Sequence, residues 1–166
     1  MADAESGRPI VRADIESFLY REVRLLDERR FAEWMNLFAK DGYYWVPAYP
    51  GQKDPYETVS IFFDDRELMK TRLSRLHHPQ IHAQKPPSRT CHFVSNVEID
   101  EAYGEPGEIL AYSTLMMLEY RLDKQTTYGG RCRHLLRPKD DDFLIAWKRV
   151  DLINCDGVFE PLAVPF

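Results

Sequence analysis

Three histidines close together are the first residues whose chemistry and spacing suggest a site. Imidazoles four residues apart on one helix can share a metal ion, and His78 and His82 have that spacing. Pro79 lies between them, however, and no Asp or Glu falls between His77 and Gln84 to complete a ligand set. We therefore interpret His77 and His78 as the C-terminal end of a helix, where positive charge is favourable. The chain is expected to bind no metal.

Two cysteine–histidine pairs are the next candidates. Cys91-His92 supplies half of the ligand pattern of a Rieske iron–sulfur cluster, which needs two cysteines and two histidines, and the second half is missing. Cys132 and His134 alternate to the same strand face as Tyr128. Because a nucleophile needs a positioned base, which spacing alone does not supply, a buried or interfacial face is favoured over a catalytic dyad.

Composition narrows the class of protein. With 166 residues the chain fits one domain, and we expect a flexible N-terminus over residues 1–12 and a single domain over 13–166. The formal charge of −5 disfavours nucleic acid as a partner. Three dispersed cysteines, no signal-peptide pattern and no apolar stretch of ~18 residues predict a reduced protein of the cytoplasm with no membrane segment.

The first half of the chain predicts helices. Apolar residues recur at helical spacing over 15–26 and again over 31–38, with Asp14 as the expected N-cap of the first helix. Asp41-Gly42 is expected to end the helical run before a strand over 43–46. A short strand over 58–63 and a third helix, capped by Asp64 or Asp65 and ended before Pro79, follow.

The second half predicts strands. Three long runs, 109–121, 126–137 and 143–154, are separated by short polar connections, which favours antiparallel pairing. In the first run both faces carry apolar groups, so one face is expected to meet the helices and the other a partner. We expect a bulge at Gly129-Gly130, since no phosphate-binding glycine motif is present. Helices followed by a meander predict an α+β fold.

Three stretches of sequence fit one known family. Residues 87–96 read Pro-Ser-Arg-Thr-Cys-His-Phe-Val-Ser-Asn, and 128–131, Tyr-Gly-Gly-Arg, are followed by Leu-Leu-Arg at 135–137. Residues 25–47 look like the family's N-terminal helices and first strand. From about Arg12 to its end, the chain resembles the small (beta) subunit of aromatic-ring-hydroxylating dioxygenases.

This resemblance implies a cone-shaped fold of the nuclear-transport-factor-2 (NTF2-like, cystatin-like) kind, with N-terminal helices packed on a curved antiparallel sheet. It also implies a structural, cofactor-free subunit that is inactive alone and supports an alpha subunit. The alpha subunit would hold a Rieske cluster and a mononuclear iron and add dioxygen to an arene to give a cis-dihydrodiol. The expected assembly is alpha3beta3, with this chain self-associating as a trimer. Residues 59–65 have a benzoate- or toluate-oxygenase look.

Arginines are the main candidates for contacts between subunits, because guanidinium groups suit bidentate recognition of carboxylates on another chain. A solvated strand face with pairs inside the chain is the open alternative. The contact candidates are Arg89, His92, Tyr128, Arg131, Arg137 and Arg149.

A different function is compatible with the same fold, which also hosts isomerases and dehydratases that work inside the cone. Such an enzyme needs a general acid and a general base in a pocket. The candidates for this alternative are Asp41, Tyr44 and His92. In the favoured interpretation the chain has no catalytic residue.

Overall fold

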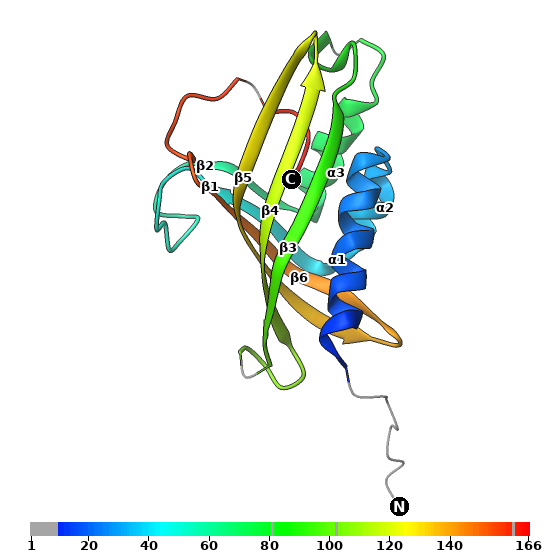
Figure 1. Ribbon diagram of the computed structural model, residues 1–166, viewed down its shortest axis with the longest axis vertical. Helices are drawn as coiled ribbons and strands as arrows, with labels where there is room; N and C mark the ends of the chain where they lie inside the picture. The colour runs from blue at the N-terminus through cyan, green and yellow to red at the C-terminus, as the bar shows by residue number, and fades with distance from the viewer. Residues whose placement is uncertain (1–9, 81, 102, 161) are drawn as a thin grey trace, which may run out of the picture.

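A computed structural model of the protein describes residues 10–80, 82–101, 103–160 and 162–166. Helices α1 (Arg12–Asp27), α2 (Phe31–Asn36) and α3 (Arg66–Leu76) lie along one side of a strongly twisted sheet (Figure 1). A short 3-10 helix, η1 (His82–Gln84), precedes the long strands. The flexible N-terminus expected over residues 1–12 falls largely outside the described residues, and α1 begins at Arg12.

The sheet has six strands in the order β2-β1-β6-β5-β4-β3. Strands β3 to β6 form the expected antiparallel meander, which confirms the α+β fold, whereas β1 and β6 pair in parallel. The strands are β1 (Phe38–Pro47), β2 (Ser60–Asp65), β3 (Arg89–Asp100), β4 (Ile109–Arg121), β5 (Lys124–Lys139) and β6 (Asp142–Leu152).

The first helix packs an apolar side into the core. Ile15 and Phe18 are at most 2% exposed, as their helical spacing predicts. The N-cap is Val11, so the assignment of Asp14 to that position is wrong. The Asp14 carboxylate instead accepts a hydrogen bond from the Val11 backbone N–H at 3.0 Å. This is the reciprocal contact of a capping box, and it satisfies a donor at the helix start.

The first strand starts earlier than the sequence predicts. It begins at Phe38, and Asp41 and Gly42 lie inside it, at a break in its pairing with β6 between Phe38 and Tyr43. The expectation that Asp41-Gly42 ends the helical run is therefore wrong. A Cβ at Gly42 would lie 2.8 Å from the Ile145 backbone oxygen, so the close approach of β6 requires glycine here.

The inner face of the sheet and the helices enclose the core. On β4, Ala111, Leu115 and Met117 point inward and are buried, while Tyr112 and Met116 point outward and are 38% and 39% exposed. This face was expected to meet the helices, and its buried residues belong to the core cluster that also contains the apolar side of α1. That the outer face meets a partner stays a prediction.

The adjacent glycines of β5 form no bulge. The ladder between β4 and β5 runs without a shift through Gly129 and Gly130, so the expected bulge is wrong. Gly130 instead permits close packing against β6, because a Cβ there would lie 2.9 Å from Leu152 Cα and closer still to the Asp151 backbone oxygen.

Candidate functional site

Glu22 on α1 is the centre of a polar cluster inside the curve of the sheet. Its carboxylate accepts hydrogen bonds from Lys148 Nζ at 2.7 Å and from Trp34 Nε1 at 3.0 Å, and it lies 2.9 Å from His134 Nε2. Glu22, His134 and Lys148 are at most 2% exposed. The cluster connects α1 to β5 and β6 across the core, and its pairing allows the charges to stay buried.

Neighbouring groups fix the protonation states of this cluster. Burial alone raises the pKa of Glu22, but Lys148 and His134 outweigh it and hold that pKa far below its ordinary value. Burial lowers the pKa of His134, but Cys132 and Glu22 raise it to about 9. At neutral pH the imidazole is therefore protonated and, like Lys148, pairs with the Glu22 carboxylate.

Residues 164–166 fill the space in front of the cluster. The Phe166 backbone N–H donates to the Tyr44 hydroxyl at 3.0 Å, and the Phe166 backbone oxygen accepts from Lys148 Nζ at 2.5 Å. The Phe166 ring is buried and meets the Tyr128 ring edge-on at a centroid distance of 5.3 Å. The hollow left beside this segment measures about 20 Å³, which has room for a water molecule but not for an organic substrate.

The three acid–base candidates are kept apart. Tyr44 lies on β1 and His92 on β3, with β6, β5 and β4 between them. Asp41 is exposed and accepts a hydrogen bond from Arg137 at 2.7 Å. Burial raises the pKa of Tyr44 well above its ordinary value. Within the described residues each of the three side chains has its own partner, which is Phe166 for Tyr44, Arg137 for Asp41 and Asp27 for His92.

His92 belongs to a contact that holds α1 against β3. Its Nδ1 lies 2.5 Å from the Asp27 carboxylate, which also accepts from the His92 backbone N–H at 3.0 Å and from Thr90 Oγ1 at 2.9 Å. Burial raises the pKa of Asp27, but these hydrogen bonds lower it further than burial raises it. Ser88 nearby donates to Glu119 at 2.5 Å. The motif over 87–96 thus positions elements of the fold.

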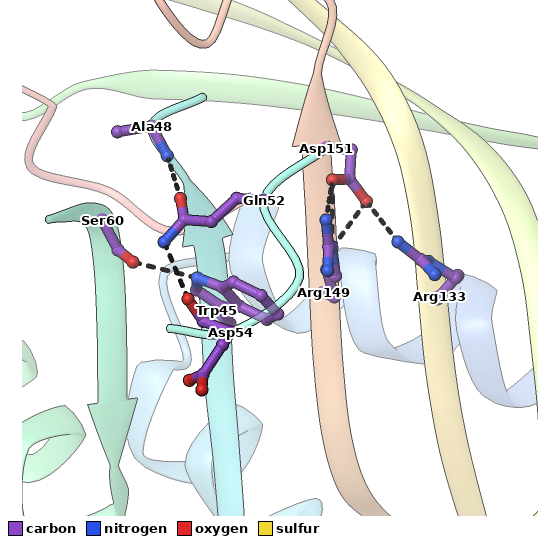
Figure 2. A network of polar contacts seen from close by, with 8 residues as sticks. All are labelled: Trp45, Ala48, Gln52, Asp54, Ser60, Arg133, Arg149 and Asp151. Carbon is purple, nitrogen blue, oxygen red and sulfur yellow. Dashed lines mark hydrogen bonds and ion pairs between the residues drawn. The ribbon is translucent and has the colours of Figure 1, made fainter. Parts of the chain in front are cut away.

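An open groove lies on the outer face of the sheet, with a volume of about 730 Å³. Asp151 accepts hydrogen bonds from Arg149 Nε at 2.9 Å and from Arg133 Nη2 at 3.0 Å (Figure 2). The Arg149 guanidinium stacks over the Trp45 ring at 4.2 Å. We call this the outer groove; its lining includes Pro50, Glu98, Tyr112, Arg131, Arg133 and Asp151.

A preorganised loop between β1 and β2 forms one wall of the outer groove. The buried Gln52 side chain accepts from the Ala48 backbone N–H at 3.2 Å and donates to the Asp54 backbone oxygen at 3.3 Å (Figure 2). The loop presents Tyr56 and Val59, which are 83% and 70% exposed. Sequence reasoning missed this loop, although Pro47, Pro50 and Gly51 marked a turn there.

The six predicted contact residues divide between the two faces. His92 and Tyr128 are buried on the inner side, and Arg149 is buried against Trp45. Arg137 pairs with Asp41 and Glu108 inside the chain. Arg89 is exposed and lies over the Tyr120 ring at 4.7 Å, and Arg131 is exposed in the outer groove and forms no ion pair among the described residues.

His77 and His78 follow α3, and His82 begins η1. Among the residues that the structure describes, no three His, Cys, Asp or Glu side chains are grouped as ligands. His77 is the C-cap of α3, as expected, and His78 Nδ1 accepts from the Gln80 backbone N–H at 3.3 Å. In the described ranges, no helix is long and apolar enough to cross a membrane.

Comparison with known proteins decides the family. The family model described as "Ring hydroxylating beta subunit" matches residues 21–156. The chain belongs to this family. The small oxygenase component of the p-cumate 2,3-dioxygenase system of Pseudomonas putida is 33% identical over 142 residues, which are 84% of this chain and 78% of that protein.

Solved structures agree with the fold of a ring-hydroxylating beta subunit. The beta subunit of the benzoate 1,2-dioxygenase from Burkholderia mallei ATCC 23344 is 28% identical, with a TM-score of 0.74 over 89% of this chain and 94% of that one. A protein of Novosphingobium aromaticivorans DSM 12444 assigned as a scytalone dehydratase shares the fold alone, at 16% identity and a TM-score of 0.57 over 84% and 82% of the two chains. The NTF2-like architecture expected from the resemblance is confirmed, and an alpha subunit is the family's partner.

Proposed function

We propose that this beta subunit supports, without cofactor of its own, an alpha subunit that carries a Rieske cluster and a mononuclear iron and cis-dihydroxylates an arene. The main observation that supports this proposal is that the interior of the cone is filled by the chain itself. Residues 164–166 occupy the centre of the cone, and Tyr44 and Lys148 hold that segment in place. A free-standing isomerase or dehydratase needs open space there for its substrate.

The outer groove is the surface that we assign to the alpha subunit. Its three guanidinium groups, on Arg131, Arg133 and Arg149, face the two carboxylates of Glu98 and Asp151. Asp151 engages Arg133 and Arg149, so the exposed Arg131 is left to recognise a carboxylate of the partner. Such a pair supports orientation and specificity as well as affinity.

We assign the trimer contact of an alpha3beta3 complex to the apolar part of the outer face. Phe93 and Met116 lie opposite each other on β3 and β4 and are 48% and 39% exposed. Exposed apolar neighbours of this kind favour association with another copy. The complex would work in the cytoplasm.

The substrate that we propose is an aromatic acid of the benzoate kind. Two of the similar proteins are named for the oxygenation of p-cumate and of benzoate, both aromatic carboxylates. The substrate would bind to the alpha subunit.

Co-purification tests the assignment of the outer groove. The chain is expressed with a tagged alpha subunit from the same source, and Arg131→Glu is expected to reduce the recovered beta subunit at least about tenfold, because like charges then face each other. Arg30→Glu is the matched control, since Arg30 is exposed at the turn between α1 and α2 and pairs with Glu28 and Glu33. Full recovery of folded Arg131→Glu would contradict the assignment.

A further inference from the structure

The proposed supporting role does not explain the particular contacts that bind Phe166 inside the cone. Its ring packs edge-on against Tyr128 and Phe62, at centroid distances of 5.3 Å and 6.5 Å. Its backbone oxygen accepts from Lys148 Nζ at 2.5 Å, and its backbone N–H donates to Tyr44 at 3.0 Å. An aromatic wall beside a buried cation and a hydroxyl is how proteins bind a small aromatic acid.

The charges around the Phe166 oxygen favour an anion. Lys148 Nζ donates to the Glu22 carboxylate and to the Phe166 oxygen, while His134 lies between Glu22 and the Cys132 sulfur, which is 3.7 Å from its Nδ1. Glu22, His134 and Lys148 are buried, so their fields are poorly screened. A negatively charged oxygen at the position of the Phe166 oxygen would accept from the buried Lys148 ammonium in the same way, with a stronger attraction.

The segment that occupies this space is not part of any helix or strand. The described residues from 153 to 166 form no helix or strand. Val164 and Phe166 are 2% and 0% exposed and act as the anchors. Local opening of such a segment exposes less apolar surface than unfolding of the whole sheet and so requires less free energy.

We propose that the cone interior is a latent binding site for a small arylalkanoate, and that residues 164–166 occupy it as an intramolecular substitute. The length of the ligand is inferred from the phenylalanine residue that it would replace. In a phenylalanine residue two carbon atoms separate the ring from the carbonyl carbon, and the same spacing occurs in 3-phenylpropanoate. The carboxylate binds Lys148, and the ring takes the place of the Phe166 ring between Tyr128 and Phe62.

Calorimetric titration of the full chain with 3-phenylpropanoate tests this site. Val164→Ser/Phe166→Ser removes both anchors and is expected to bind at least about tenfold more tightly than the wild type, because the ligand no longer has to displace the segment. Tyr20→Ser removes an exposed aromatic ring on α1 and should bind as the wild type does. Equal affinities of the double variant and the wild type, or no binding by the folded double variant, would overturn the proposal.

Two smaller ligands distinguish a specific site for an aromatic acid from a nonspecific apolar cavity. Ethylbenzene lacks the carboxylate and propanoate lacks the ring, so each should bind the double variant at least about tenfold more weakly than 3-phenylpropanoate does. If ethylbenzene binds equally well, the variant has only an apolar hole, as engineered cavities do, and the proposal fails.

The wild-type chain provides a test that does not depend on the folding of the variant. Bound 3-phenylpropanoate should accelerate hydrogen exchange of the Phe166 amide, which donates to Tyr44 when the segment is in place. Amides within β5 should be unaffected. A Phe166 amide that exchanges at the same rate with and without the probe contradicts displacement of the segment.

Discussion

Gly129 and Gly130 are neighbours on β5, yet only one of them has room for a side chain. A Cβ at Gly130 would lie 2.9 Å from Leu152 Cα, whereas the nearest atom to a Cβ at Gly129 is the Leu115 backbone oxygen, at 3.9 Å. Gly130→Ala is therefore expected to lower the free energy of unfolding by about 1–3 kcal/mol, because backbone atoms must move. Urea unfolding at constant m-value measures the change, and Gly129→Ala is the matched control. Equal stabilities of the two variants would refute the steric account.

The His134 imidazole makes stability fall at alkaline pH. Its pKa rises from 6.5 to about 9 on folding, so its contribution is complete below pH 6.5 and is lost as the pH rises through 9. We expect the free energy of unfolding of the wild type to decrease between these two values, and the decrease to be smaller in His134→Gln. His82→Gln replaces an exposed histidine and is the matched control. Urea denaturation across this range measures the slope; a flat wild-type profile would show that His134 is not protonated in the fold.

At the scale of elements, α3 depends on a cap that the sequence predicted. The Asp65 carboxylate accepts from the Leu68 backbone N–H at 2.9 Å, which satisfies one of the free donors at the helix start. Asp65→Ala should lower stability by about 0.5–2 kcal/mol, and Asp65→Asn much less, because asparagine also caps. Thermal unfolding of the three proteins gives the order. An alanine variant as stable as the wild type would mean that the cap contributes nothing.

Periodicity predicted the elements well where one face is buried. The strand over 109–121 and the third helix were found with close bounds, since alternation and helical spacing report directly on burial. The start of β1 was missed because Asp41-Gly42 has the composition of a turn, and only the approach of Ile145 on a distant strand explains the glycine. Contacts of that kind leave no local signal.

The candidate site was less predictable than the elements. Alternation placed Tyr128 and His134 on one face, but it could not say that Glu22, far away in the sequence, would meet His134 across the core. The outer groove joins the loop around Gln52 to β5 and β6, and the parallel pairing of β1 with β6 brings them together. Such pairing depends on the whole chain.

At the scale of the molecule, the cone is filled and the outer groove is open. We therefore propose that the protein acts through its surface. Val164 and Phe166 complete the core, so the interior contributes to stability, and the open outer groove is the surface that we propose for the alpha subunit. In the proposed function the electron transfer and oxygen chemistry belong to the alpha subunit, so the beta subunit needs no reacting group. We propose that the beta subunit instead positions the alpha subunits, since such chemistry is sensitive to geometry.

Turnover by the reconstituted oxygenase tests the supporting role most directly. Tyr44→Phe and His92→Gln remove the hydroxyl and the imidazole that could transfer protons, and assembly of each variant with the alpha subunit is verified by light scattering. The account predicts turnover within a fewfold of the wild type for both, since neither group meets a substrate. A loss of about a hundredfold or more in a fully assembled complex, independent of subunit concentration, is the effect of a missing acid or base and would contradict it.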